Sequence, residues 1–183
     1  MPATPPPKGI YVPVPTFFVS PSASNYNTFA PPLDLTTQTK HAIHLAKCGI
    51  RGLVVLGSTG EAIMVTNSER TTLLTHLRQE LEKAGFKDYP LIAGTATQSI
   101  AETVQTLKEA KEAGSQWGLV LAPGYFAPMV SQEGLVAWYS AVADASPMPV
   151  MMQVCRIIHT VVGVRWSTAL TMEDQISLPR RVK

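Results

Sequence analysis

The hydroxyl side chains of Ser58 and Thr59 stand between two glycines, in the stretch Gly57-Ser58-Thr59-Gly60-Glu61. Glycine lets the backbone turn sharply and expose its N–H groups, and the two hydroxyl groups add further donors. Such a loop can hold a small anion, but glycine and serine are also common in ordinary turns between a strand and a helix. The loop by itself leaves both interpretations open.

Other residues with chemical potential lack the partners that their chemistry needs. His41 and His44 are spaced i, i+3 on one helix, but no carboxylate or third ligand accompanies them, which favours solvated side chains over a metal site. Cys48 and Cys155 have no Cys or His at zinc spacing and are expected to be reduced thiols. For Glu61, we expect a role in stabilising the loop and not in acid catalysis.

Alternating strands and helices position the glycine-rich loop. Short apolar runs predict strands within residues 9–18, 51–56, 90–94, 118–122 and 149–152. Between them, Asp34, Thr66, Ser99 and Ser131 can each cap an amphipathic helix, and Glu69 and Glu102 complete possible capping boxes. Five buried strands alternating with four helices require parallel pairing, in a (β/α) barrel or an open doubly wound sheet.

The loops that follow the strands are expected to share one mouth. Residues 57–61, 94–97 and 123–126 all leave the carboxyl ends of predicted strands, where both candidate folds carry their chemistry. No G-x-G-x-x-G follows the first strand and no G-K-[ST] occurs, so the dinucleotide and nucleoside triphosphate interpretations lose their usual support.

Composition narrows the class of protein. The chain has 183 residues, 45% of them hydrophobic and 15% charged, which describes a globular domain. Residues 1–152 contain ten Lys/Arg and eleven Asp/Glu, for a net charge of −1, whereas residues 153–183 contain five and two, for +3. Without a basic face or a long apolar run, we expect no nucleic acid partner, no membrane span and a soluble, cytoplasmic protein.

The order of the segments resembles the dihydrodipicolinate synthase/N-acetylneuraminate lyase family, and within it the 4-hydroxy-2-oxoglutarate aldolase type. The resemblance covers about residues 9–152 and lies in GIYVPVPTFF, RGLVVLGSTGEAIMVTNSER, PLIAGTA, VLAPGYF and SPMPVM. It implies a TIM-type (β/α)8 barrel that binds pyruvate or another 2-oxo acid as a Schiff base on a lysine. The implied reaction is an aldol cleavage or condensation that uses no metal or organic cofactor.

The resemblance also implies roles for three residues. Ser58 and Thr59 match the positions that hold the substrate carboxylate, in agreement with the chemistry of the loop. Tyr125 matches a catalytic tyrosine that, in many members, reaches across a tight dimer interface into the partner's proton relay. The aldehyde that such an enzyme would release or accept remains open.

Two departures from the family pattern bear on catalysis. Where the fifth strand of the family runs into a proton-transferring tyrosine, this chain has Gln153, whose amide is a poor proton shuttle near neutral pH. A Schiff-base lysine needs a buried or cation-flanked amine, but no lysine here ends a buried strand. The eight lysines are Lys8, Lys40, Lys47, Lys83, Lys87, Lys108, Lys111 and Lys183.

The C-terminal segment 153–183 neither resembles the family nor alternates strand with helix. We therefore expect a partial barrel domain at residues 9–152, with about five βα units of eight, followed by a divergent tail. Our hypothesis is that a change of reading frame or of splicing near residue 153 replaced the ancestral sequence. The alternative is a C-terminus that diverged naturally. Ile157 to Val164 is β-branched enough to extend or add a strand.

Two functions follow from these expectations. The first is a member of this lyase family that is inactive because it lacks the lysine and the relay tyrosine. The second is a non-catalytic fragment or assembly partner that retains the 2-oxo acid loop. A barrel that stops at five strands leaves two unpaired sheet edges, so we expect association with itself or with a full-length relative.

Overall fold

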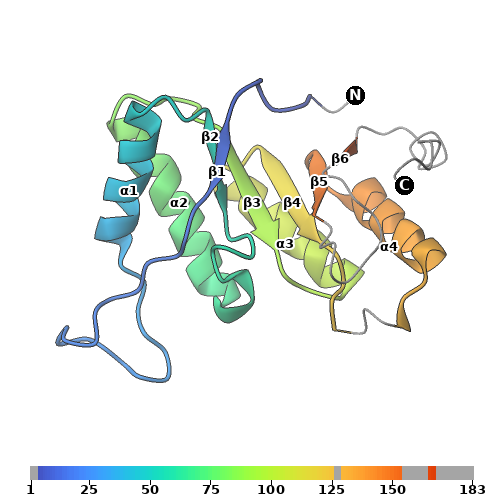
Figure 1. Ribbon diagram of the computed structural model, residues 1–183, viewed down its shortest axis with the longest axis horizontal. Coiled ribbons are helices and arrows are strands. Elements are labelled where there is room, and N and C mark those ends of the chain that lie inside the picture. The colour runs from blue at the N-terminus through green and yellow to red at the C-terminus, as the bar shows by residue number, and fades with distance from the viewer. Residues whose placement is uncertain (1–3, 126–128, 154–164, 168–183) are drawn as a thin grey trace, which may run out of the picture.

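The five predicted strands lie side by side in one parallel sheet. The computed structural model describes residues 4–125, 129–153 and 165–167. The strands pair in the order of the sequence and curl into about half of a (β/α) barrel, with the helices packed against one face (Figure 1). They are β1 (Tyr11–Pro13), β2 (Gly52–Val55), β3 (Leu91–Thr95), β4 (Trp117–Leu121) and β5 (Val150–Gln153). This confirms the predicted parallel α/β architecture and its resemblance to an incomplete barrel.

Each helix begins at the capping residue that the sequence predicts. The helices are α1 (Leu35–Lys47), α2 (Asn67–Lys83), α3 (Ile100–Glu112) and α4 (Gln132–Ala145), and a 3₁₀ turn, η1 (Ala62–Met64), precedes α2. The side chains of Asp34, Thr66, Ser99 and Ser131 each accept a hydrogen bond from a backbone N–H in the first turn. At α2 the capping box is reciprocal, because the Glu69 carboxylate also accepts from the Thr66 N–H at 2.9 Å.

The alternation of side chains along the strands divides the core into two clusters. On the outer face, Leu53, Leu91 and Val120 are among the strand residues that pack against the leucines of α2 and α3. On the inner face of the curl, four strand residues form a smaller cluster: Val54, Ile92, Trp117 and Leu119. Gln153 has the same parity as Met151 of the inner face, so β5 directs its last side chain into the curl.

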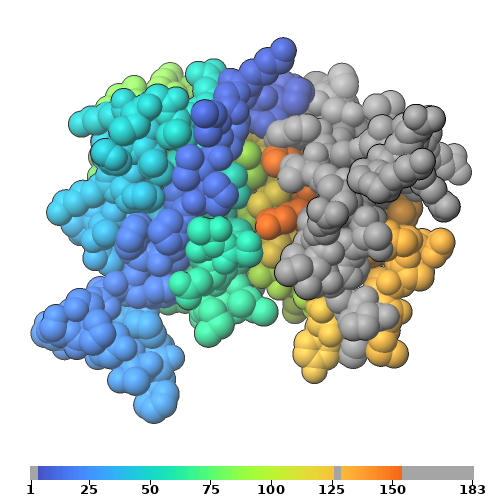
Figure 2. Space-filling model, in the orientation of Figure 1, coloured from blue at the N-terminus to red at the C-terminus, as the bar shows by residue number. Residues whose placement is uncertain are grey.

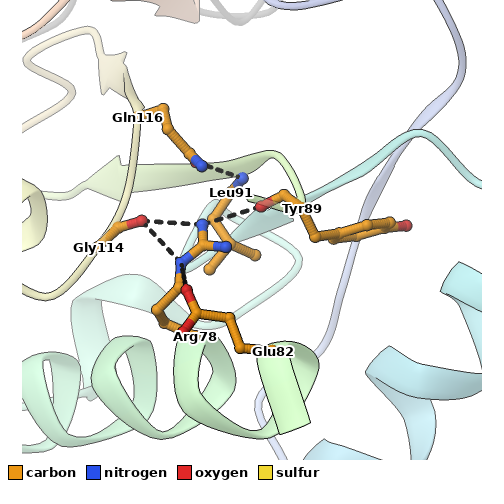
Figure 3. A network of polar contacts seen from close by, with 6 residues as sticks. All are labelled: Arg78, Glu82, Tyr89, Leu91, Gly114 and Gln116. Carbon is orange, nitrogen blue, oxygen red and sulfur yellow. Dashed lines mark hydrogen bonds and ion pairs between the residues drawn. The ribbon is translucent and has the colours of Figure 1, made fainter. Parts of the chain in front are cut away.

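An arginine on α2 fastens the amino ends of β3 and β4 (Figure 3). The guanidinium of Arg78 donates to the carbonyl of Tyr89 at 2.8 Å and to that of Gly114 at 2.9 and 3.1 Å. Beside it, the Gln116 side chain accepts from the N–H of Leu91 at 2.9 Å. Burial lowers the pKa of Arg78, because the charged form loses its hydration there. This clamp lies at the opposite end of the sheet from the glycine-rich loop.

The segment before α1 departs from the expected single strand. Only Tyr11–Pro13 pairs with β2, and Phe18 instead forms an isolated antiparallel bridge with Leu33. In the space-filling view this blue segment crosses the front of the molecule and lies against teal atoms of the segment after β2 (Figure 2). One contact there is the hydrogen bond from the Thr16 hydroxyl to the carbonyl of Gly60, at 2.6 Å.

The sheet has two edge strands, as expected, but the second edge is not β5. A short sixth strand, β6 (Arg165–Ser167), pairs antiparallel with β5 over Val150–Met152, and β5 itself extends to Gln153. An antiparallel partner needs no crossover helix, so it breaks the βα alternation and makes β6, in place of β5, the last described strand of the sheet. The expected strand at Ile157 to Val164, as well as Cys155 and Lys183, lies outside the described residues. In the part that is described, no helix has the length and apolarity that crossing a membrane requires.

Candidate functional site

The loops at the carboxyl ends of the strands enclose a cavity of about 890 Å³. Its walls come from the segments after β2, β3 and β4 and from the end of β5. The lining residues are Ser58, Glu61, Ala62, Ile63, Ala96, Thr97, Gln98, Glu102, Leu121, Ala122, Gly124, Tyr125 and Gln153. The predicted common mouth is therefore confirmed, except that Phe126 lies outside the described residues.

The glycine-rich loop after β2 is a tight, internally bonded turn. The carbonyl of Gly57 accepts from the N–H groups of Gly60 at 3.0 Å and Ala62 at 3.3 Å, and that of Ser58 accepts from Glu61 at 3.2 Å. Leu56, at φ 60°, and Glu61, at φ 51°, flank the turn in the left-handed region, which is unusual for side chains of their size. Strained backbone of this kind is concentrated at binding sites, where surrounding contacts hold it in place.

The loop leaves donors available at the mouth. Within the described residues, the backbone N–H groups of Ser58 and Thr59 and the hydroxyl of Thr59 have no hydrogen-bond partner. The Ser58 oxygen accepts from the side-chain amide of Gln153 at 3.3 Å, so its own O–H is left to donate. Ser58 lines the cavity, whereas Thr59 is exposed beside it and is not among the lining residues. An anion would find up to four donors here.

Gln153 is fixed at the end of β5 by a buried tyrosine. The hydroxyl of Tyr139, on α4, donates to the carbonyl of Gln153 at 3.1 Å and lies 3.5 Å from that of Val120. Burial raises the pKa of Tyr139 well above its ordinary value, so the phenol keeps its proton and its donor role. The side-chain oxygen of Gln153 is buried and has no hydrogen-bond partner among the described residues. Sequence reasoning identified Gln153 as a departure from a pattern but did not foresee its contact with Ser58.

Sequence reasoning missed Arg70, which lies directly behind the loop. Arg70 is only 6% exposed, and its guanidinium donates to the carbonyl of Ala62 at 3.1 Å and to that of Gly94. It thereby joins the segment after β2 to β3. The signal in the sequence was an arginine at the fourth position of a helix whose neighbouring residues are polar, and nothing in that pattern distinguishes it from a solvated arginine.

Tyr125 lies at the rim of the cavity on the segment after β4. Its side chain is 80% exposed, and its backbone N–H donates to the Gln98 side chain at 3.3 Å. The carbonyl of Gln98 accepts in turn from the indole of Trp138 at 3.0 Å, so α4 supports this side of the mouth. Tyr125 and Ser58 therefore share one cavity, as the sequence predicted.

The charged residues of the mouth are acidic. Glu61 and Glu102 line the cavity, and among the described residues no lysine or arginine does so. Every lysine that the structure describes, from Lys8 to Lys111, is exposed, and none reaches the end of a strand. The Glu61 carboxylate makes no hydrogen bond among these residues, so only its backbone stabilises the loop. No group of three potential metal ligands occurs in the described ranges, and His41 packs edge-on against Phe17.

Known proteins similar to this chain are aldolases and synthases of one family. The model of the "Dihydrodipicolinate synthetase family" matches residues 22–156. The chain is 40% identical over 153 residues to an L-threo-3-deoxy-hexylosonate aldolase of Aspergillus niger, covering 83% of this chain and 43% of that protein. It is also 40% identical over 170 residues to "Probable 4-hydroxy-2-oxoglutarate aldolase, mitochondrial" of Emericella nidulans, covering 93% of this chain and 50% of that protein.

A solved structure shares the fold. A prophage protein of the dihydrodipicolinic acid synthase family from E. coli K12, in complex with pyruvate, superposes with a TM-score of 0.68 at 27% identity. The match covers 82% of this chain and 45% of that one. The chain thus spans about half the length, or less, of the relatives that it matches.

Proposed function

The chain belongs to the dihydrodipicolinate synthetase family, and we propose that the mouth of its half-barrel binds the carboxylate of pyruvate or another small 2-oxo acid. The observation that carries this proposal is the turn Gly57–Glu61, which presents the free N–H groups of Ser58 and Thr59 together with the Ser58 hydroxyl. Convergent backbone and hydroxyl donors are suited to a carboxylate, whose two oxygens accept several hydrogen bonds. The pyruvate complex of the similar E. coli protein supports this substrate class.

We further propose that this chain binds without turning its ligand over. Aldol chemistry of the class I type needs an amine with a lowered pKa to form the Schiff base. The described lysines are all solvent-exposed, which leaves their amines strongly hydrated. The side chain that β5 directs into the cavity is the amide of Gln153, which holds Ser58 but does not shuttle protons.

Two measurements on the full chain test these proposals. Titration with pyruvate should show saturable binding that Ser58→Ala weakens, whereas Thr71→Ala, a hydroxyl loss on the exposed face of α2, should leave it unchanged. Borohydride treatment in the presence of pyruvate should give no covalent adduct by intact mass. An adduct on any lysine would overturn the proposal of inactivity, and a chain that does not bind pyruvate would overturn the proposed function.

The second candidate function is an assembly partner of a full-length relative. Large apolar side chains are exposed on the segments after β2 and β4: Ile63 is 78% exposed, Met64 71%, Tyr125 80% and Met129 83%, and Ile63 and Tyr125 line the cavity. Side chains of this kind gain free energy when another surface covers them. Co-expression with a full-length relative should yield a complex on size-exclusion chromatography. A soluble, dispersed monomer that ignores the relative would contradict this function and also self-association.

For location, we propose the cytoplasm. No helix among the described residues has the length and apolarity to cross a membrane. The Emericella nidulans relative is named mitochondrial, which makes the mitochondrion the competing location. Fractionation of cells that express the tagged chain decides between the two.

A further inference from the structure

The geometry points to Arg70 as the source of the positive potential that holds the carboxylate, acting from behind the wall of the cavity. This inference rests on the proposed function and deepens it. The donors of the turn are neutral, and the two carboxylates among the described lining residues, Glu61 and Glu102, repel an anion. A nearby cation would strengthen the binding of a carboxylate at such a site, and the described residues of the lining supply none.

Arg70 is in contact with the wall of this cavity. One arm of its guanidinium donates to the carbonyl of Ala62, and Ala62 itself lines the cavity. The N–H of Ala62 donates in turn to the carbonyl of Gly57, so the charge and the turn are joined through a single peptide layer. The other arm donates to the carbonyl of Gly94. Gly94 packs so closely against the turn that a Cβ added to it would lie 2.8 Å from the nitrogen of Gly57. Both contacts place the cation directly against the turn.

The charge of Arg70 is not consumed by an ion pair. Among the described residues the two ion pairs are Arg78–Glu82 and Lys83–Glu80, and Arg70 takes part in neither. Glu109 is the carboxylate whose charge acts on it, from beyond ion-pair distance. Burial lowers the pKa of Arg70, but a guanidinium remains protonated in proteins. A buried charge whose hydrogen bonds go to backbone carbonyls still acts on nearby charges, because water screens it weakly in low-dielectric surroundings.

Arg78 provides a matched control on the same helix. It too is an arginine of α2 whose guanidinium donates to two backbone carbonyls, and its pKa is also lowered by burial. Its contacts, drawn in Figure 3, lie just before β3 and β4. The cavity is lined by residues that follow β3 and β4, at the other end of these strands. Replacing either arginine by glutamine removes the charge, retains an amide donor and disturbs a similar set of contacts with backbone carbonyls. Only Arg70, however, contacts the carboxylate turn.

The test compares the binding of pyruvate with that of pyruvamide, a neutral analogue that retains the 2-oxo group. We expect Arg70→Gln to weaken pyruvate binding about tenfold, the order expected for a unit charge one peptide layer away at an effective dielectric of about 20, and to change pyruvamide binding less than about twofold. Arg70→Lys should preserve the preference for pyruvate over pyruvamide, since it retains the charge. Arg78→Gln should leave that preference unchanged.

Each outcome separates the inference from its premise. If Arg70→Gln weakens both ligands equally, or neither, Arg70 is only a structural clamp and the inference fails while the proposed function stands. Loss of the preference in Arg78→Gln would also overturn it, because the effect would then not depend on position. A wild-type chain that does not bind pyruvate overturns both. If Arg70→Gln does not fold, Arg70→Lys becomes the test. A folded Arg70→Lys variant that no longer prefers pyruvate over pyruvamide would contradict the inference.

Discussion

Replacing Gly94 by alanine should destabilise the fold far more than the same change at Gly57, although both glycines lie at the mouth. A Cβ on Gly94 would stand 2.6 Å from the carbonyl carbon of Leu56 and 2.8 Å from the nitrogen of Gly57, and still closer to the Leu56 oxygen. These are backbone atoms of a turn held by internal hydrogen bonds, so they have no rotamer into which to escape. Overpacking of a core costs about 1–3 kcal/mol, and we expect about 3 kcal/mol here.

Gly57→Ala serves as the control. Its Cβ would meet side-chain atoms at 3.7 and 3.8 Å, which is ordinary van der Waals contact, and its φ is not in the left-handed region. Alanine there should leave the free energy of unfolding unchanged or raise it by about 0.5 kcal/mol, because it restricts the unfolded chain. Urea unfolding followed by circular dichroism measures both variants. Equal stabilities for the two would refute the close packing of β3 against the turn.

Three further changes probe other contacts. Thr66→Ala should lower the free energy of unfolding by about 1 kcal/mol, because it removes the acceptor for the Glu69 N–H at the start of α2; urea unfolding measures this loss. Burial raises the pKa of Tyr139 above its ordinary value of 10.0, so the stability that its neutral form contributes is fully present below about pH 10 and is lost as the pH rises further. In Tyr139→Phe, the free energy of unfolding should therefore fall less steeply at alkaline pH, which a series of unfolding curves at increasing pH measures. Gln153→Tyr should restore a phenol to β5 without restoring chemistry, so borohydride trapping with pyruvate should still give no adduct.

The elements of the fold were predictable because they follow from local rules. The side chains of Asp34, Thr66 and Ser131 each accept a hydrogen bond from the backbone N–H three positions later. Such a cap depends on the local sequence alone, so it could be predicted without the rest of the fold. Buried strands that alternate with such helices must pair in parallel, so the shared mouth followed as well. The resemblance to a barrel family then reduced two possible sheets to one.

The contacts within the site were not predictable, because they join segments far apart in sequence. The Gln153–Ser58 contact spans 95 positions, and that of Arg70 with Gly94 spans 24. A buried arginine and a solvated one look alike in a helix sequence, since the difference lies in which carbonyls the neighbouring loops present. The pairing of β6 with β5 was missed for the same reason, since Arg165–Ser167 has no periodicity long enough to indicate a strand.

The edges of the sheet bear on how the chain would associate. At one edge, β6 already occupies the position that a strand from another copy would need beside β5. At the other edge, the N–H of Val14 points toward β2, where it bonds the carbonyl of Val54 at 3.0 Å. By alternation Pro13 and Pro15 point outward, and proline has no N–H to offer to a partner strand. The prolines make the β1 edge a poor partner for strand addition, so association would proceed through the outer side of β6 or through the exposed apolar side chains near the mouth.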